Sequence, residues 1–391
     1  MLRFSPPHVS IPPEVRWMLL RAFGPPGAPS SGSVAAAAAL AMARRFEVAP
    51  RIAVRQGRAR LAAELGEGAA GFQRDLTASA AQGLRLEAVL LDVLERAVAR
   101  EIPLVPLKLA ALEAAGRVAP GARSACDLDL LAPPERAEEL QQDLLDHGFR
   151  TSGLPPSEHQ LPALIHPAGG VVEVHRLIPG VRPGTAGSAT VASLEAAGLL
   201  APAPGLPGCR LPVQEVLIAH ALVHGIGQHG FWPDSYSLLR TLGDLIDLGF
   251  HQEEEAPRAE RAVALVARDV STEEAEATRS LCRALAEGID LVESPSPAGI
   301  LLRHILAGRL DPDYAAALRL NLFRSQPSDR APLVRMVRTA FGALFLSRAQ
   351  IDAIYGKPRH PLGYLGRRLA RPFDLLRRLW SYSRRALQRK G

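Results

Sequence analysis

Two aspartates separated by one residue stand in a short apolar run, Asp127-Leu128-Asp129-Leu130-Leu131. Side chains alternate between the two faces of a strand, so Asp127 and Asp129 share one face while Leu128 and Leu130 point to the other face, toward the core. Two neighbouring carboxylates repel each other and resist ionisation unless a cation lies between them. The pattern therefore favours a divalent cation with oxygen ligands, Mg²⁺ or Mn²⁺.

A later segment repeats this alternation and supplies a third carboxylate. Within residues 171–176, two valines alternate with Glu173 and His175, so both polar side chains lie on one face. We expect Glu173 to join Asp127 and Asp129 as a catalytic metal ligand. Three acids could hold two ions, one neutralising a triphosphate and the other activating an attacking hydroxyl. The competing interpretation is structural, because Asp-x-Asp pairs are also common in solvated surface loops.

The elements that must position these residues predict an α+β fold. A helix opens at Pro133-Pro134 and ends at Gly148, and residues 164–166 and 171–177 flank a Pro-Ala-Gly-Gly turn, as in a hairpin. Residues 102–107 form a short apolar run, followed by a short helix over residues 110–115. We expect a small mixed sheet embedded between largely helical N- and C-terminal regions.

The pattern of apolar residues and of Gly/Pro-rich connectors divides the 391 residues into four parts. Residues 1–100 are predicted to be a helical N-terminal region, 101–180 the α/β core, 181–350 a helical C-terminal domain and 351–391 a basic amphipathic tail. Within the first part, leucines and valines between residues 86 and 94 recur at spacings of three and four, which is typical of an amphipathic helix.

The net positive charge of the chain arises in its tail. Residues 355–391 contain eleven of the 46 basic residues and one of the 40 acidic residues, so the rest of the chain is slightly acidic. Phe373, Leu376, Trp380 and Leu387 are spaced for one helix face. Such a helix suits an anionic membrane surface, nucleic acid phosphates, a partner or packing on the chain's own body. No motif predicts sequence-specific binding to nucleic acid.

Three cysteines at residues 126, 209 and 282 match no zinc spacing and cannot all pair with one another. This usage favours the reducing cytoplasm. The beginning of the chain lacks the order of a secretory signal, and no uninterrupted apolar stretch is long enough to cross a bilayer. We therefore expect a cytoplasmic protein, with a peripheral position at the inner face of the membrane as the alternative that the tail suggests.

The order of motifs from residue 102 to residue 175 resembles the uncharacterised bacterial nucleotidyltransferase family, within the polymerase-β-like superfamily. The matching features are a Leu-Lys element, an arginine before an Asp-x-Asp strand, a helix ending at Gly-Phe and a Glu-x-His strand: Leu107-Lys108, Arg123, Asp127-Leu128-Asp129, Gly148-Phe149 and Glu173-Val174-His175. The flanks also match, with a helix containing His220 and His224 followed by one containing Asp244.

The resemblance implies a substrate, a cofactor and further site residues. The substrate is an NTP, the cofactor is Mg²⁺ or Mn²⁺, and the acceptor is not identified. Lys108 can pair with phosphate as a point charge and Arg123 as a bidentate fork, while the alternative for each is a surface cation. His175 lies beside the metal or the phosphate, or else forms a hydrogen bond with a carboxylate.

One residue departs from the family pattern. Where the family has Gly after the lysine, this chain has Leu109, whose side chain hinders a close approach of phosphate to the backbone. A second hypothesis follows, in which the protein is a catalytically inactive relative that binds a nucleotide or acts as a scaffold, with the tail at a membrane.

His220 and His224 lie one helical turn apart, a spacing that can bind zinc. However, Ala221 stands where a metalloprotease motif has glutamate, so we do not expect a zincin site. We expect both histidines either to line the cleft against the α/β core, together with Asp244, or to be hydrogen-bonded histidines of an interface. The Gly-rich segment 225–233 is interpreted as a loop or substrate-facing flap.

Overall fold

The computed structural model describes residues 10–29, 32–152, 159–184, 187–229, 237–311, 314, 360, 362–370 and 373. The N-terminal part is helical, as predicted, and its elements are α1 (Pro13–Phe23), α2 (Ala36–Arg45), α3 (Ala49–Leu65), the 3-10 turn η1 (Gly66–Gly68) and α4 (Ala69–Ala99). The amphipathic helix expected around residues 86–94 is the second half of α4, where Leu86, Val89 and Val93 are buried.

A five-stranded mixed sheet follows, which confirms the predicted α+β class. Its elements are β1 (Val105–Pro106), α5 (Lys108–Ala114), β2 (Asp127–Leu131), α6 (Ala137–Asp146), β3 (Arg150–Thr151), β4 (Leu164–Ile165) and β5 (Val171–His175). The strand order is β1-β2-β5-β4-β3. β2 and β5 are parallel, and the other neighbours are antiparallel. The two strands that carry acids are thus direct neighbours at the centre of the sheet.

The predicted hairpin is present between β4 and β5. Leu164 pairs with Val172 and Ile165 with Val171, and the amide of His166 donates to the carbonyl of Gly170. Gly169 and Gly170 have φ values of 91° and 101°, which side-chain-bearing residues rarely adopt. The turn therefore needs both glycines, and it fixes the register that puts Glu173 and His175 on one face.

Two small strands and a set of helices follow: α7 (Val191–Ala196), β6 (Leu200–Pro202), β7 (Arg210–Pro212), α8 (Gln214–Ala221), the π-helix η2 (Leu222–Gln228), α9 (Leu238–Asp247), α10 (Ala256–Val266), α11 (Thr272–Glu287) and α12 (Pro297–Leu310). Residues 362–370 form a further helical segment. Among the described helices, none is long and apolar enough to cross a membrane. The predicted C-terminal helical domain covers residues 181–350, and its part from residue 315 lies outside the described residues.

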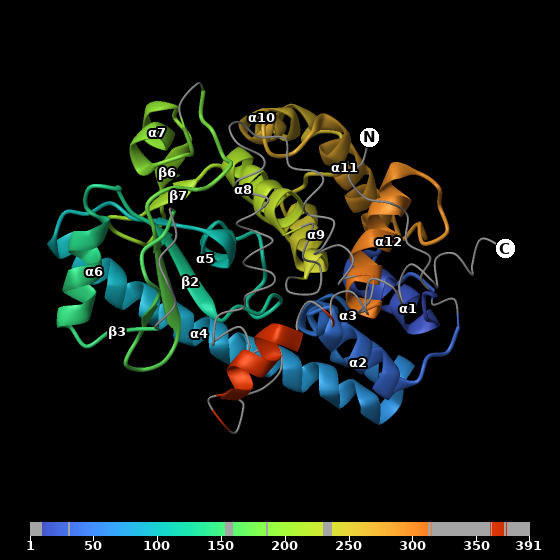
Figure 1. Cartoon of the computed structure of the whole chain (residues 1–391). Helices are drawn as coiled ribbons and strands as arrows, with labels where there is room; N and C mark the ends of the chain where they lie inside the picture. Colours follow the sequence, from blue (N-terminus) through green and yellow to red (C-terminus); the bar gives the residue numbers. More distant parts are fainter. Residues whose placement is uncertain are drawn as a thin grey trace.

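Helix α4 links two hydrophobic cores (Figure 1). Its first half contributes Phe72 to a core shared by α1–α3 and by α8–α12. Its second half contributes Val89 and Val93 to a core with the sheet and α6. The guanidinium of Arg51 on α3 also forms a two-pronged ion pair with Asp247 on α9, at 2.6 and 2.7 Å. The N-terminal helices α1–α3 thus pack against the later helices α8–α12. The division of the chain into four parts stays a prediction.

Within the apolar run 102–107, Val105 and Pro106 form β1. One local expectation differs from the structure. Residues 225–228, interpreted as part of a loop, belong to the π-helix η2, while residues 230–236 lie outside the described part of the chain. The glycines of that segment are compatible with a helix here because Gly225 packs tightly against α9. A Cβ atom on Gly225 would lie 2.5 Å from Cγ2 of Thr241.

Candidate active site

The parallel pairing of β2 and β5 brings the acidic positions together. Asp129 is directly opposite Glu173, and Leu131 is opposite His175. Because paired residues of neighbouring strands point to the same face, both acids and the imidazole project from the same side of the sheet. One donor atom from each of Asp129, Glu173 and His175 lies within 4.8 Å of the others. This is the arrangement that the alternation of acid and apolar residue predicts.

Asp129 is the most enclosed acid of the group, with 2% of its surface exposed. Its Oδ1 atom lies 2.7 Å from Nζ of Lys108 and 2.9 Å from Nε2 of His175. Burial alone would raise the pKa of Asp129, but the charge of Lys108 and the hydrogen bond from His175 hold it well below its usual range. The carboxylate is therefore ionised within the protein.

The imidazole of His175 also faces Glu173, with Nε2 3.7 Å from Oε2. Burial would lower the pKa of His175, but hydrogen bonds with Asp129 and Glu173 outweigh it and raise the pKa. The predicted alternative for this residue, a hydrogen bond to a carboxylate, is thus the contact present in the structure. His175 also stacks on His159, with ring centroids 5.7 Å apart.

Asp127 lies at the more open end of the same face. Burial raises its pKa, and repulsion from Asp129 adds to the effect. Such a group has a negative charge that its surroundings do not fully compensate. A divalent cation would relieve the repulsion, because Asp129, Glu173 and His175 already offer converging donors and Asp127 is on the same strand face. The donor set fits Mg²⁺ through its oxygens and Mn²⁺ through oxygen and imidazole.

Lys108 reaches Asp129 from an unusual backbone conformation. Its φ is 47°, in the left-handed region that costs a residue with a side chain on the order of 1–3 kcal/mol. The preceding residue, Leu107, donates its amide to the carbonyl of Asp129 at 2.9 Å, which ties the start of α5 to β2. Leu109 is 5% exposed and belongs to the main core while it also lines the cavity described next.

A cavity of about 470 Å³ covers this face of the sheet. The α/β part contributes Lys108, Asp127, Asp129, Glu173 and His175, together with His159 and Gln160. The helical part contributes His220, His224, Gln228, His229 and Arg240. The prediction that His220 and His224 line a cleft against the α/β core is confirmed. The cavity has an acidic side on the strands and a side rich in imidazole on α8 and η2.

The π-helix arranges the histidines of the second side. A π-helix closes hydrogen bonds between residues five apart, which aligns their side chains. The amide of His229 donates to the carbonyl of His224 at 3.0 Å, and their rings lie 4.6 Å apart. Burial, with Lys108 as the next cause, lowers the pKa of His220 to about 3 and that of His229 to about 4. These imidazoles are therefore uncharged at neutral pH.

Two arginines complete the helical side. Nε of Arg123 lies 3.0 Å from Oδ1 of the buried Asp244 on α9. One turn earlier on α9, Arg240 lies 3.1 Å from Glu47 and donates to the carbonyl of Ser124 at 3.4 Å. Burial raises the pKa of Asp244 in spite of Arg123. Both arginines therefore line the cavity while each is paired with an acid, Asp244 and Glu47.

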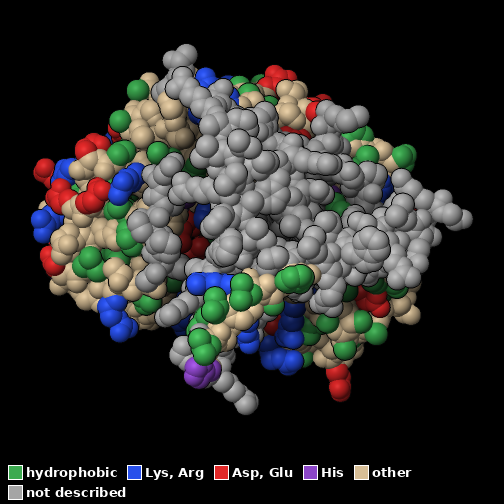
Figure 2. Space-filling model, viewed as in Figure 1, with side chains coloured by type: hydrophobic (Ala, Val, Ile, Leu, Met, Phe, Trp, Pro, Cys, Tyr) green, Lys and Arg blue, Asp and Glu red, His purple; other side chains and the backbone are tan. Residues whose placement is uncertain are grey.

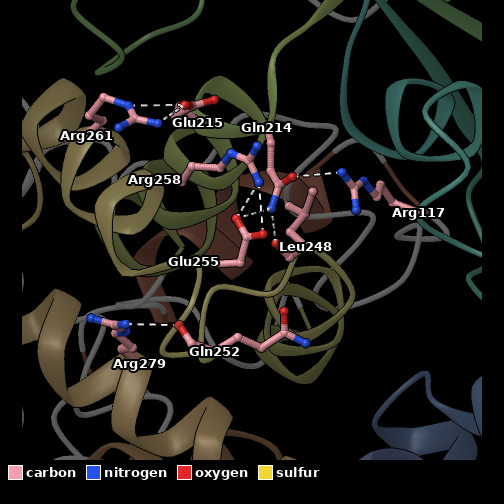
Figure 3. Close-up of polar contacts among 9 residues, drawn as sticks. All are labelled: Arg117, Gln214, Glu215, Leu248, Gln252, Glu255, Arg258, Arg261 and Arg279. Carbon is pink, nitrogen blue, oxygen red and sulfur yellow. Dashed lines mark hydrogen bonds and ion pairs between the residues drawn. The ribbon is translucent and has the colours of Figure 1, made fainter.

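Polar contacts at the start of α8 hold the helix that carries His220 (Figure 3). The side-chain nitrogen of Gln214 donates to the carbonyl of Leu248, at the end of α9, at 2.6 Å. Its side-chain oxygen accepts from Arg117, which follows α5, at 2.7 Å. The next residue, Glu215, accepts from Arg261 on α10 at 2.6 Å. These contacts thereby hold α8 against α9, α10 and the segment after α5.

All six residues predicted to form the site line the cavity: Lys108, Arg123, Asp127, Asp129, Glu173 and His175. Asp129 contacts Lys108 and His175, and His175 also contacts Glu173. Asp127 lines the cavity without being one of the three converging donors, and Arg123 pairs with Asp244 on α9. Their roles with metal and nucleotide stay predictions. His166 lies elsewhere, 3.1 Å from Asp92.

Sequence reasoning missed Arg240 as a cavity residue. Its signal was its position four residues before Asp244, on the same face of a leucine-rich helix. A polar pair on the buried face of an amphipathic helix indicates an interior polar site rather than a solvated surface.

A comparison with protein families supports the same interpretation. Residues 33–286, nearly two thirds of the chain, match the family described as uncharacterised nucleotidyltransferase. No curated protein and no solved structure matches the chain. The matched range includes β2, β5, α8, η2 and α9, and so both sides of the cavity. The protein therefore belongs to the family of uncharacterised nucleotidyltransferases.

Proposed function

We propose that the protein is a metal-dependent nucleotidyltransferase that moves an NMP group from an NTP to an acceptor. The observation that carries the proposal is the convergence of Asp129, Glu173 and His175 at one side of the 470 Å³ cavity, with Lys108 against Asp129. This volume lies within the range of small-ligand pockets, and it is bordered by acids on one side and by arginines on the other.

In the proposed reaction, an oxygen of the acceptor attacks the α-phosphorus of the NTP. A new P–O bond forms, the bond to the bridging oxygen breaks, and pyrophosphate leaves. Glu173 serves as a ligand or takes the proton of the attacking hydroxyl. Lys108, Arg123 and His175 hold the nucleotide phosphates, joined by Arg240 from the helical side. The leucines and valines on the buried face of β2 and β5 anchor the two strands and so hold the acids in place.

The cofactor is Mg²⁺ or Mn²⁺, held by Asp127, Asp129 and Glu173, with His175 beside them. When bound, such an ion neutralises phosphate charge and lowers the pKa of an attacking hydroxyl. The protein's own contribution is to hold the three acids on one face, to keep Asp129 ionised through Lys108 and His175, and to enclose the reacting groups between the sheet and α8–α9.

A second candidate is a nucleotide-binding protein without transfer activity. Leu109 supports it, because this buried side chain lines the cavity at the position where the family has Gly. A leucine there limits how closely a phosphate approaches the backbone after Lys108. Both candidates bind an NTP, and only the first releases pyrophosphate.

An experiment with NTPs labelled at different phosphates separates the two candidate functions. The purified protein is incubated with Mn²⁺ or Mg²⁺, a bacterial extract as the source of acceptor, and NTPs labelled on either the α- or the γ-phosphate. The proposal expects an acceptor labelled from the α-position only, with loss of labelling in Asp129→Asn and Glu173→Gln. Asp75→Asn, which alters a surface ion pair with Arg44, is the matched control. NTP binding without label transfer at any position would favour the inactive candidate.

We also propose that the protein acts in the cytoplasm. Its three cysteines are free, and Cys209 and Cys282 are buried, with burial raising the pKa of Cys209 to about 11. Buried thiols that form no disulfide bond agree with a reducing compartment, and the cytoplasm also supplies NTPs. Fractionation of cells that express the tagged protein tests this proposal, and recovery from an oxidising compartment would contradict it.

A further inference from the structure

The helical segment 362–370 and the nearby Phe373 present apolar side chains to solvent. Leu362, Leu365, Leu369 and Phe373 are 70, 55, 62 and 75% exposed. Their spacings of three and four residues put them along one side of a helix. Figure 2 shows hydrophobic side chains gathered on this segment, with Lys and Arg side chains beside them. Four large apolar side chains on one exposed face are a feature that folding of the described chain does not explain.

The polar side of the same helix is the more covered one. Tyr364, Arg367 and Arg368 are half-buried, whereas the leucines are exposed. An amphipathic helix that packs on its own protein buries its apolar face, whereas this segment exposes its apolar face and half-buries its polar one. This orientation disfavours the interpretation that the leucines serve the core of the protein. Covering these side chains with an apolar phase outside the molecule would be favourable, because it removes their apolar surface from water.

The charge of the tail selects the kind of phase. Residues 355–391 carry eleven basic residues and one acid, a net charge of +10 by sequence. A second copy would bring the same charge and be repelled, and a nucleic acid would leave the leucines in water. A surface of anionic lipid satisfies both features, because the headgroups attract the basic residues and the acyl chains accept the apolar face.

We propose that the exposed face formed by Leu362, Leu365, Leu369 and Phe373 docks the protein on an anionic lipid surface. Nine helical residues extend about 14 Å, so the segment lies along the membrane rather than through it. The apolar side chains enter the boundary between headgroups and acyl chains. Arg367 and Arg368, on the other side of the helix, reach the phosphates along their flexible stems. This docking is independent of the transfer reaction.

Vesicle flotation of the full-length protein tests the proposal. One set of vesicles contains phosphatidylcholine alone, and the other contains about a third phosphatidylglycerol. We expect binding to the anionic set, weakening as salt is added. The variant Leu365→Glu/Leu369→Glu should bind at least ~10-fold more weakly, since each glutamate opposes both insertion and charge attraction. Leu84→Glu/Leu91→Glu, at exposed leucines of α4, is the matched control and should bind like the wild type.

A second variant reports insertion without removing the apolar face. In Leu369→Trp the indole emission should shift to shorter wavelength on anionic vesicles and be quenched by brominated acyl chains, whereas Leu84→Trp should show neither effect. Equal binding to neutral and anionic vesicles, or unchanged flotation of Leu365→Glu/Leu369→Glu, would overturn the proposal. A lipid-free dimer that this double variant converts to a monomer would overturn it in favour of self-association.

Discussion

Lys108 and Asp129 form the central ion pair of the cavity, with Nζ 2.7 Å from Oδ1. The contact joins the first residue of α5 to the middle of β2, and Leu107 reinforces it by donating its amide to the carbonyl of Asp129. An ammonium on a buried carboxylate does in part what a metal ion would do there, since both neutralise its charge. The ion pair therefore stabilises the fold when no metal is bound, and it competes with a metal ion for the charge of Asp129.

Lys108→Met should lower the free energy of unfolding by about 1–3 kcal/mol, because Asp129 loses a charged partner while buried. The left-handed backbone remains occupied by a residue with a side chain, so its cost is unchanged. Excess Mn²⁺ should raise the melting temperature more in this variant than in the wild type. The measurement is thermal unfolding with and without Mn²⁺. A variant as stable as the wild type, or one with a smaller response to Mn²⁺, would contradict this account of the pair.

Arg240→Ala should weaken NTP binding by at least ~10-fold while changing NMP binding little, since a guanidinium on the helical side would contact the β- and γ-phosphates. The measurement is fluorescence titration with NTP and NMP analogues that carry a reporter on the ribose. Arg258→Ala, which removes an exposed ion pair with Glu255, is the control. An equal loss for NTP and NMP would assign Arg240 to the nucleoside instead.

Gly225→Ala should destabilise the fold by about 1–3 kcal/mol. The added methyl group would collide with Thr241, whose Cγ2 and Oγ1 would lie 2.5 and 2.6 Å away, and so would separate η2 from α9. Gly83→Ala on α4 is the opposite case, because the nearest atom, Oε1 of Glu113, lies 3.9 Å from the new Cβ. We expect Gly83→Ala to stabilise by up to about 1 kcal/mol through helix propensity. Urea unfolding measures both, and equal effects would contradict the tight contact.

His220 should reduce stability as the solution becomes acidic. Burial, followed by Lys108, lowers its folded-state pKa from 6.5 to about 3. Above pH 6.5 neither state binds the proton, so stability is unaffected; below it only the unfolded chain does, and stability falls until pH reaches about 3. The contribution of His220 at pH 5 is a loss of about 2 kcal/mol.

Comparison of variants isolates this effect from other titrating groups. His220→Asn should lose less stability between neutral pH and pH 5 than the wild type, as measured by urea unfolding at both pH values. His147→Asn changes a histidine whose side chain is 46% exposed, and it should retain the acid loss of the wild type. The same acid loss in His220→Asn would show that this imidazole does not stay neutral in the folded protein.

The sequence predicts the acidic side of the site well and the helical side poorly. Alternation along β2 and β5 is a local property, and it correctly places Asp129, Glu173 and His175 on one face. The hairpin turn is also local, because its glycines specify it. By contrast, the π-helix η2 and the approach of Arg240 depend on packing between segments far apart in the chain.

The left-handed conformation of Lys108 could not be predicted either. Nothing in the residue type favours it, and contacts with β2 maintain it. The sharing of one core by α1–α3 and α8–α12 has the same origin. Apolar periodicity identifies which face of each helix is buried, but it does not specify which other helix covers that face.

Metal-dependent binding of a non-cleavable NTP tests the central claim most directly. Calorimetry with an analogue that carries an α,β-methylene bridge needs no acceptor and no turnover. We predict binding that requires Mn²⁺ or Mg²⁺ and that weakens at least ~10-fold in Asp129→Asn and in Glu173→Gln, with Asp75→Asn unchanged. Binding that is equally tight without a divalent ion, or that survives both substitutions, would contradict the assignment of these acids to a metal–nucleotide site.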